Sequence, residues 1–310
     1  MKFKKPFFWD LPKQSYLSYL LFPFSIPIII KNFITRFLKK KKSSTIKTIC
    51  VGNIYLGGTG KTPLTIKIYE ILRSLNKKVA TVKKYHSDQS DEQLLLKQKT
   101  SLLIVNSRKN ALKPSLNYNY DTLIFDDGLQ DMQIDYDIKI VCFKTKNWIG
   151  NGQLIPAGPM REKISSLKRF NAVILNGYSK NIDMIEEQIQ NLNPNIKIFR
   201  TDYEIFNIQK YDINAKYLIF SGIGNPSDFK EILIKNKFNV IKEMIFPDHY
   251  QYNFNDLINI INNAKNEKLK ILTTEKDFMR IPEEFKKKIS FLSINLFIKN
   301  EKKFIDFLNK

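Results

Sequence analysis

A glycine-rich segment close to the amino terminus constrains this chain more than any other feature of its sequence. Residues 57–62 read Gly-Gly-Thr-Gly-Lys-Thr. They lie between a β-branched run at 46–51 and a helical pattern at 61–75, which is the strand–loop–helix context of a phosphate-binding loop. Glycines let the backbone wrap around a polyphosphate, and the first N–H groups of the helix point toward it. A glycine-rich loop of another kind is the alternative, but the Lys-Thr pair at the junction favours a nucleoside triphosphate site.

The residues of this loop have distinct expected roles. We expect the nucleotide to be contacted by Gly57, Gly58, Thr59, Gly60, Lys61 and Thr62. Lys61 is expected to reach the β- and γ-phosphates, and the Thr62 hydroxyl is expected to bind Mg²⁺. The glycine that usually opens such a loop is displaced, because Gly52 stands five residues before Gly57. The Gly-Thr-Gly-Lys-Thr core is nevertheless complete.

Two adjacent carboxylates follow a later apolar run. Residues 123–125 read Leu-Ile-Phe and lead into Asp126 and Asp127. An acid at the carboxyl end of a buried strand is the layout of a Walker B element, which holds Mg²⁺ beside the phosphate loop. The alternative is an acidic turn before Gly128. The phosphate loop favours a metal-side role for both carboxylates.

The first 42 residues carry an apolar segment followed by a basic one. Residues 16–30 are almost wholly apolar, and residues 39–42 are four lysines. The apolar stretch is shorter than the roughly 18 residues expected of a spanning helix, and it contains Pro23 and Pro27. Apolar side chains in a bilayer surface, with lysines against anionic headgroups, fit this pattern. We expect an interfacial membrane anchor, and a helix buried against the domain is the alternative.

Short apolar strand patterns alternate with helical ones along the rest of the chain. The expected strands after the phosphate loop are 79–83, 101–105, 121–125, 138–143, 171–175, 217–220, 239–245, 269–273 and 289–294. Helices are expected in the second series at 226–235, 254–265 and 302–309. Such alternation predicts parallel sheets covered on both faces. The expected fold is therefore α/β: an N-terminal membrane-associated helix and basic segment (1–42), a P-loop NTPase-like parallel-sheet core (43–205) and a second, smaller α/β domain (206–310).

The composition indicates an anionic partner. The formal net charge is +21, which fits a membrane surface, a phosphorylated substrate or a nucleic acid. Lys, Asn and Ile are frequent throughout the chain, so part of this charge reflects a compositional bias. The base-stacking motifs of RNA-binding modules are absent, which argues against nucleic acid. The two cysteines, Cys50 and Cys142, lie in apolar runs and indicate neither a disulfide framework nor a zinc site.

Three further motifs are ambiguous when each is taken alone. Asp91 and Glu92 precede a leucine run and could simply cap a helix. Arg161 and Glu162 close a turn-rich loop, where the guanidinium suits phosphate contact but is more often at the surface. His249 follows a carboxylate that could orient it, although an ordinary surface histidine is the commoner case.

Together and in this order, the motifs resemble those of the tetraacyldisaccharide 4'-kinase family of lipid A biosynthesis. The matching segments lie between positions 51 and 277. They are Val51-Gly52-Asn53 with Gly57 to Leu64, Asp91-Glu92, Asp126 to Gln130, Gly150 to Glu162, Gly222 to Pro226, Phe246 to His249, and Thr274 to Asp277. The most specific are the segment from Gly150 to Glu162 and the Phe-Pro-Asp-His run ending at His249.

This resemblance implies a monotopic kinase at the cytoplasmic face of the inner membrane. Such an enzyme moves the γ-phosphate of ATP onto the 4'-hydroxyl of a tetraacylated glucosamine disaccharide 1-phosphate, with ATP and Mg²⁺ as cofactors. The implied partners are ATP, this acylated lipid and the membrane surface, and no nucleic acid.

The resemblance also assigns roles to side chains. Asp91 would accept the hydroxyl proton, His249 would be its partner, and Lys61 would act on the phosphates. The implied metal-side residues are Thr62, Asp126, Asp127 and Glu92. The implied phosphate- or substrate-contacting residues are Gln130, Arg161, Glu162 and Arg108.

Some features depart from the family pattern and leave two other classes of function open. After the second strand, the family usually has Ser-Arg-Gly-Tyr-Gly followed by a longer stretch before the Asp-Glu pair. In this chain, residues 83–87 run almost directly into Asp91. A nucleotide-driven switch or nucleic-acid-associated NTPase would normally show Asn-Lys-x-Asp, which residues 274–277 only partly resemble. The other alternative is a relative that binds the lipid without phosphorylating it. The residues that argue against it are Lys61, Asp91, Asp126 and His249.

Overall fold

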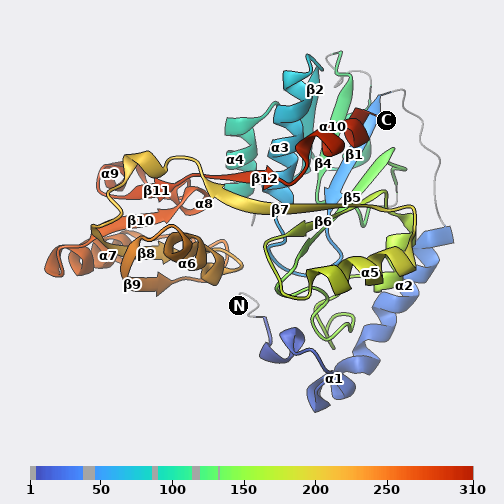
Figure 1. Cartoon of the computed structure of the whole chain (residues 1–310), viewed down its shortest axis with the longest axis horizontal. Coiled ribbons are helices and arrows are strands. Elements are labelled where there is room, and N and C mark those ends of the chain that lie inside the picture. The colour runs from blue at the N-terminus through green and yellow to red at the C-terminus, as the bar shows by residue number, and fades with distance from the viewer. Residues whose placement is uncertain (1–4, 38–45, 86–89, 114–118, 132, 310) are drawn as a thin grey trace. The chain divides into compact units, whose positions relative to one another are not determined.

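The computed structural model describes residues 5–37, 46–85, 90–113, 119–131 and 133–309 (Figure 1). Its contacts divide the chain into two compact units. The core unit comprises Lys5–Tyr85, Lys99–Asp202 and Phe297–Lys310, and the second unit contains His86–Gln98 and Tyr203–Leu296. Each unit is built around one sheet.

The core unit carries most of an eight-stranded sheet with the order β12-β7-β6-β5-β1-β4-β2-β3. Its strands are β1 (Lys47–Gly52), β2 (Val79–Lys84), β3 (Leu102–Val105), β4 (Thr122–Asp126), β5 (Ile138–Lys144), β6 (Ala172–Asn176), β7 (Lys197–Ile205) and β12 (Ile294–Ile298). The pairs from β3 through to β7 are parallel. In a parallel sheet the carboxyl ends of adjacent strands share one edge, so the ends of β1, β2 and β4 lie together. The predicted parallel α/β core is confirmed.

The central strands are apolar on both faces because helices cover them. Every residue of β4 and β6 is buried. The helices of this unit are η1 (Phe7–Asp10), α1 (Tyr16–Leu21), η2 (Phe22–Ser25), α2 (Ile26–Phe37), α3 (Lys61–Ser74), η4 (Arg108–Leu112), η6 (Ile164–Arg169), α5 (Ile182–Leu192) and α10 (Glu301–Asn309). Helix α3 contacts β1, β2 and β4 and buries Leu64, Ile68 and Leu72, which are spaced by four residues along one helix face.

The second unit has a four-stranded parallel sheet with the order β11-β10-β8-β9. Its strands are β8 (Lys216–Ser221), β9 (Asn239–Ile245), β10 (Lys270–Thr274) and β11 (Ser290–Leu292). Its helices are α4 (Ser90–Lys99, which ends in the core unit), η7 (Ile208–Lys210), α6 (Pro226–Lys235), α7 (Phe254–Asn266), α8 (Glu275–Phe278) and α9 (Glu283–Lys286). Helices α6 and α7 bury apolar residues in two different clusters, so both sides of this sheet have an apolar core.

Strand β7 was not among the expected strands. Its sequence, Lys-Ile-Phe-Arg-Thr-Asp-Tyr-Glu-Ile, mixes charged and apolar residues, and only Phe199 and Thr201 in it are buried. A strand near the edge of a sheet has less burial and therefore a weaker apolar pattern. Its pairing with β6 fixes its place in the sheet.

The compact units differ from the expected domain ranges at three places. The amino-terminal segment, expected as a separate range at 1–42, groups with the core unit from Lys5 on. We expected residues 206–310 to form one domain, but α10 belongs to the core unit. There, Phe304 packs on Phe199 with ring centroids 4.9 Å apart, and Glu301 pairs with Lys67 at 2.8 Å. Helix α4 lies inside the expected core range and groups mainly with the second unit. An amphipathic pattern predicts a helix but does not say which sheet the helix covers.

The amino-terminal helices expose most of their large apolar side chains. The proline positions explain their segmentation, since Pro23 and Pro27 stand in the first turns of η2 and α2. Leu20 is 60% exposed and Phe24 is 67% exposed. By length and composition alone, residues 16–34 would suffice to cross a membrane. The alternative of a helix buried against the domain does not describe this segment, whereas the four lysines at 39–42 lie outside the described residues.

Candidate functional site

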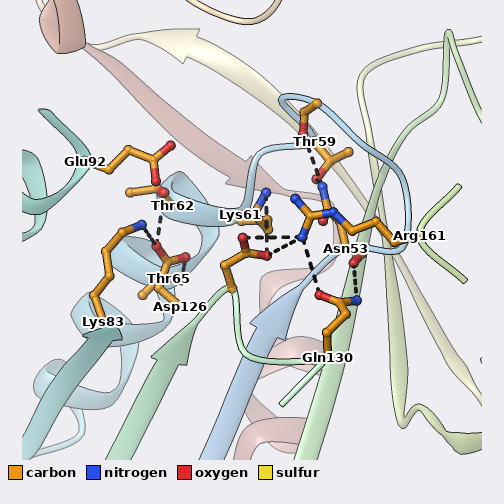
Figure 2. Close-up of polar contacts among 12 residues, drawn as sticks. Asn53, Thr59, Lys61, Thr62, Thr65, Lys83, Glu92, Asp126, Gln130 and Arg161 are labelled. Atoms are coloured by element: carbon orange, nitrogen blue, oxygen red, sulfur yellow. Dashed lines mark hydrogen bonds and ion pairs between the residues drawn. The ribbon is translucent and has the colours of Figure 1, made fainter. Parts of the chain in front are cut away.

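The phosphate loop connects the end of β1 to the start of α3 (Figure 2). Gly60 immediately precedes the helix with a φ of 88°, and Gly57 has a φ of 132°. L side chains rarely adopt such angles, so these two glycines are needed for the turn. Lys61 and Thr62 open the helix, where its unpaired N–H groups and dipole favour an anion.

A buried asparagine braces the loop from inside. Asn53 donates from Nδ2 to the carbonyl of Gly57 at 3.2 Å and to the hydroxyl of Thr59 at 3.1 Å. Gln130 donates from Nε2 to the carbonyl of Asn53 at 2.8 Å. The loop conformation is therefore held by side chains as well as by its glycines. We did not single out Asn53 as a site residue, although it stands directly after the strand that carries the loop.

Gln130 and Glu162, both expected near the substrate, lie side by side next to this brace. Gln130 Nε2 donates to Glu162 Oε1 at 3.1 Å, and Arg169 forms an ion pair with the other carboxylate oxygen. Glu162 is buried, because its carboxylate is held between these two partners. In this arrangement both side chains support the loop, and their contact with a substrate remains a prediction.

Asp127 stands at the centre of a cluster of cations. Its Oδ1 lies 3.8 Å from Lys61 Nζ and 3.3 Å from Arg161 Nη1. Arg108 donates from Nη2 to the carbonyl of Asp127 at 2.7 Å and to that of Asp126 at 3.4 Å. The structure thus brings together four of the predicted residues from distant parts of the chain. Lys61, Arg161 and Arg108 concentrate positive charge beside the phosphate loop.

Asp126 lies deeper and is enclosed by α3 and β2. Its Oδ2 lies 3.4 Å from the hydroxyl of Thr62, and its Oδ1 accepts a hydrogen bond from Thr65 at 3.2 Å. Lys83 donates from Nζ to Asp126 Oδ2 at 2.6 Å, and both side chains are buried (Figure 2). Lys83 was missed as a site residue. The only available signal was a lysine inside an otherwise apolar strand pattern.

The oxygens around Thr62 fit a hard divalent cation. Mg²⁺ prefers oxygen ligands and usually keeps several waters and substrate phosphates. The Thr62 hydroxyl and the carboxylates of Asp126 and Asp127 supply such oxygens. Among the residues that the structure describes, no cluster of three or more carboxylate, histidine or cysteine side chains could bind a metal by itself. These oxygens fit a Mg²⁺ ion that takes its remaining ligands from water and nucleotide phosphates.

The predicted residues of the second unit form a group of their own. Glu92 Oε1 lies 3.4 Å from Lys276 Nζ, and Lys276 lies 4.0 Å from Asp248. Asp248 in turn lies 3.7 Å from His249 Nε2. The side chain of Asp91 lies outside the described residues, so its pairing with His249 stays a prediction. His249 itself adopts a φ of 56°, held by its N–H donating to the carbonyl of Gly222 at 3.1 Å.

The amino-terminal segment is hydrogen-bonded to the loop that carries Arg161. This loop, residues 150–162, contains the Gly-Asn-Gly and Pro-Ala-Gly-Pro motifs. The bonds are Trp9 Nε1 to the Pro156 carbonyl (3.0 Å), Asn151 Nδ2 to Ser18 Oγ (2.9 Å), Ser25 Oγ to the Leu154 carbonyl (3.0 Å) and Asn32 Nδ2 to the Arg161 carbonyl (3.0 Å). The amino-terminal segment, with its exposed apolar helices, is therefore attached to the loop that carries Arg161 and Glu162.

Comparisons with known proteins identify the family of this chain. The family model described as LpxK, tetraacyldisaccharide-1-P 4'-kinase, matches residues 17–310. A tetraacyldisaccharide 4'-kinase of Pelagibacter ubique is 47% identical over 304 residues, covering 97% of this chain and 96% of the relative. One of Rickettsia canadensis is 30% identical and covers 97% of this chain and 95% of its own length.

A solved structure shares the fold. LpxK from Aquifex aeolicus in complex with ATP superposes with a TM-score of 0.69. It is 22% identical, and the match covers 94% of this chain and 98% of that one. On the family match and the two relatives, this chain belongs to the tetraacyldisaccharide-1-P 4'-kinase family.

Proposed function

We propose that this chain transfers the γ-phosphate of ATP to the 4'-hydroxyl of a tetraacyldisaccharide 1-phosphate, with the side-chain roles given below. The observation that carries the proposal is the cation cluster at the phosphate loop. Lys61 and Arg161 both face Asp127, beside a loop whose backbone is shaped for a polyphosphate. Phosphoryl transfer depends mainly on alignment and on stabilising the charge that spreads over the transferred group.

Each side chain of the cluster has a role in that chemistry. Lys61 would bind the β- and γ-phosphates, and Arg161 would face the transferred group, since a guanidinium can contact two phosphate oxygens at once. Thr62, Asp126 and Asp127 would hold Mg²⁺, which when bound supplies positive charge to the β- and γ-phosphates. We assign Glu92 to the same metal side as a proposal from the family pattern.

Proton removal from the acceptor is assigned to Asp91. A sugar hydroxyl attacks best when a base takes its proton in the transition state, and such a base contributes about 10²–10⁴-fold to the rate. Asp91 lies in the first turn of α4, and His249 would be its partner. The family pattern supports this pair.

The amino-terminal helices are proposed to hold the enzyme on the membrane that contains its lipid. The acyl chains of the acceptor stay in the bilayer, so its sugar is reached only at the surface. Leu20, Phe24 and Phe33 are exposed on these helices, as expected of a segment that lies in the interface. ATP is a cytoplasmic metabolite, which supports a position of the enzyme at the cytoplasmic face of the inner membrane.

The proposed reaction is tested by phosphate transfer from labelled ATP to tetraacyldisaccharide 1-phosphate in detergent micelles. The unaltered protein should make a labelled bisphosphorylated lipid, and Lys61→Ala should lower turnover by about 10²-fold or more, because a phosphate-binding charge is lost. Lys67→Ala is the matched control, since Lys67 lies on the same helix and pairs with Glu301 instead. ATP hydrolysis without lipid labelling would point to another acceptor or to a nucleotide switch.

The role of Asp91 is tested separately. Asp91→Ala should lower turnover by about 10²-fold or more while ATP affinity stays within a few-fold, because a general base is not needed for nucleotide binding. Asp228→Ala is the control, since Asp228 is also an acid in the first turn of a helix of the second unit. A collapse of ATP binding in Asp91→Ala would move Asp91 to the metal side.

A further inference from the structure

Lys83 is a buried lysine on a central strand of the core unit. It lies on β2, where the preceding residue Val82 pairs with Phe125 of β4, so Lys83 is brought beside Asp126. Its side chain is 2% exposed. Burying an ammonium group is very unfavourable unless a partner of opposite charge is present. The strand therefore carries this lysine for a reason other than packing.

The partner of Lys83 is the carboxylate expected to serve the metal. Asp126 is fully buried, and Lys83 Nζ lies 2.6 Å from its Oδ2. The same Oδ2 lies 3.4 Å from the Thr62 hydroxyl. Its other oxygen accepts a hydrogen bond from Thr65 at 3.2 Å. Figure 2 shows these three side chains converging on Asp126 from β2 and α3.

The negative charge of the neighbouring carboxylate, Asp127, is also compensated by cationic side chains. Asp127 faces Lys61 at 3.8 Å and Arg161 at 3.3 Å. Three positive side chains, Lys61, Lys83 and Arg161, thus face these two carboxylates. The nearby Arg108 has an acidic partner of its own, Asp131, at 3.7 Å. A divalent cation that entered this site alone would meet repulsion and would have to displace Lys83 from Asp126. Nucleotide phosphates would add negative charge and reverse that balance.

We propose that Lys83 is a positioning residue that occupies Asp126 as a built-in monovalent cation, so that the nucleotide-free enzyme does not bind Mg²⁺ and accepts it only together with the nucleotide. This rests on the proposed function in one respect, namely that Asp126 belongs to the metal side of a kinase site. Removing Lys83 frees a buried carboxylate next to the Thr62 hydroxyl. The variant then has a cation site that the unaltered enzyme lacks.

The test is thermal unfolding of the full chain without nucleotide or lipid, with Mg²⁺ or with NaCl at equal ionic strength. For the unaltered protein, Mg²⁺ should shift Tm by no more than NaCl does. Lys83→Met should lower Tm by roughly 10 °C in NaCl, because a buried charge loses its partner. Mg²⁺ should restore a large part of that loss, because a ligand that binds only the folded state stabilises it.

Two further variants control the test. Lys139→Met breaks an ion pair of the same length, 2.6 Å, that is partly exposed and away from the phosphate loop, and its Tm should not respond to Mg²⁺. Lys83→Met/Asp126→Asn removes both buried charges, so it should be more stable than Lys83→Met in NaCl and should not respond to Mg²⁺.

Three results would overturn the proposal. They are a Tm of the unaltered protein that rises with Mg²⁺ alone, a Lys83→Met protein that stays equally destabilised with Mg²⁺, and a double variant that still responds. If Lys83→Met does not fold, the measurement on the unaltered protein still decides. Since no step uses turnover, this proposal can fail while the kinase activity stands, and the reverse also holds.

Discussion

The phosphate loop and the amino-terminal helices belong to the same core unit, yet the chemical character of their surfaces differs. Around the loop, charged side chains are buried or half-buried and are fixed by named partners, as Asp126 is by Lys83. On the helices, apolar side chains such as Phe24 are exposed. On the proposed function, the first surface would recognise its ligand through directional contacts, and the second would bind the membrane through its exposed apolar area. A directional site should fail on a single substitution, whereas an area-based one should weaken gradually.

The sharpest way to break this comparison is Arg161→Ala. Arg161 contacts both Asp127 and Gln130 Oε1, the latter at 3.4 Å, and would face the transferred phosphate. Its loss should lower turnover by about 10²-fold, since one stabilising donor of this kind contributes that much. Transfer to lipid in micelles gives the measurement. Arg73→Ala, at the carboxyl end of α3, should keep its rate, and an Arg161→Ala rate within a few-fold would remove Arg161 from the reaction.

The anchor should respond more weakly and in proportion to the apolar area removed. Burial of one large apolar side chain contributes about 1.5–3 kcal/mol. Leu20→Ser/Phe24→Ser should therefore weaken binding to anionic lipid vesicles by about 10–100-fold, because both side chains insert only in part, and leave ATP affinity unchanged. Flotation with vesicles measures this. Tyr178→Ser is the control, since Tyr178 is 78% exposed outside the anchor. Vesicle binding that does not change would place the membrane contact elsewhere.

The smallest expected effect is a change in the pH dependence of Tm, and it comes from the contact between Asp10 of the amino-terminal segment and Tyr55 next to the phosphate loop. Burial would raise the pKa of Asp10, but hydrogen bonds from Lys5 and Tyr55 outweigh it and hold that pKa below its usual 3.8. A carboxyl with a lowered folded pKa stabilises the protein above its unfolded pKa and loses this contribution as pH falls through the folded value. The Tm of the unaltered protein should therefore fall more steeply below about pH 4 than that of Asp10→Asn. Parallel curves for the two proteins would contradict this.

The parts that sequence predicted well are those set by short, local rules. The phosphate loop needs glycines at fixed places, and Lys61 and Thr62 open α3 as their position in the motif requires. The central strands read clearly because both faces are apolar. Asp126 and Asp127 were expected near the loop because carboxylates after an apolar strand are typical of a Walker B element. The parallel pairing of β1 with β4 places them at the same edge of the sheet as the loop.

The parts that sequence missed depend on contacts between distant segments. Lys83 reads as an ordinary strand residue until β2 is placed next to β4. Asn53 reads as part of a family motif, and its brace to Thr59 appears only once the loop has folded back on it. The place of α10 in the core unit follows from its contact with Phe199, which no helical periodicity could indicate.

The hydrogen bond between Asn32 and the carbonyl of Arg161 has a consequence for the position of Arg161 relative to a membrane surface. An enzyme that lies on a bilayer and acts on a lipid headgroup must hold its active site at a defined distance from the bilayer surface. Helix α2 is hydrogen-bonded to the backbone of Arg161. If these helices lie in the bilayer surface as proposed, their depth in the lipid would set the height of Arg161 above the acyl chains. On the proposed function, the distance between the bilayer surface and Arg161 would then limit how far the acceptor hydroxyl can stand from the acyl chains of its lipid.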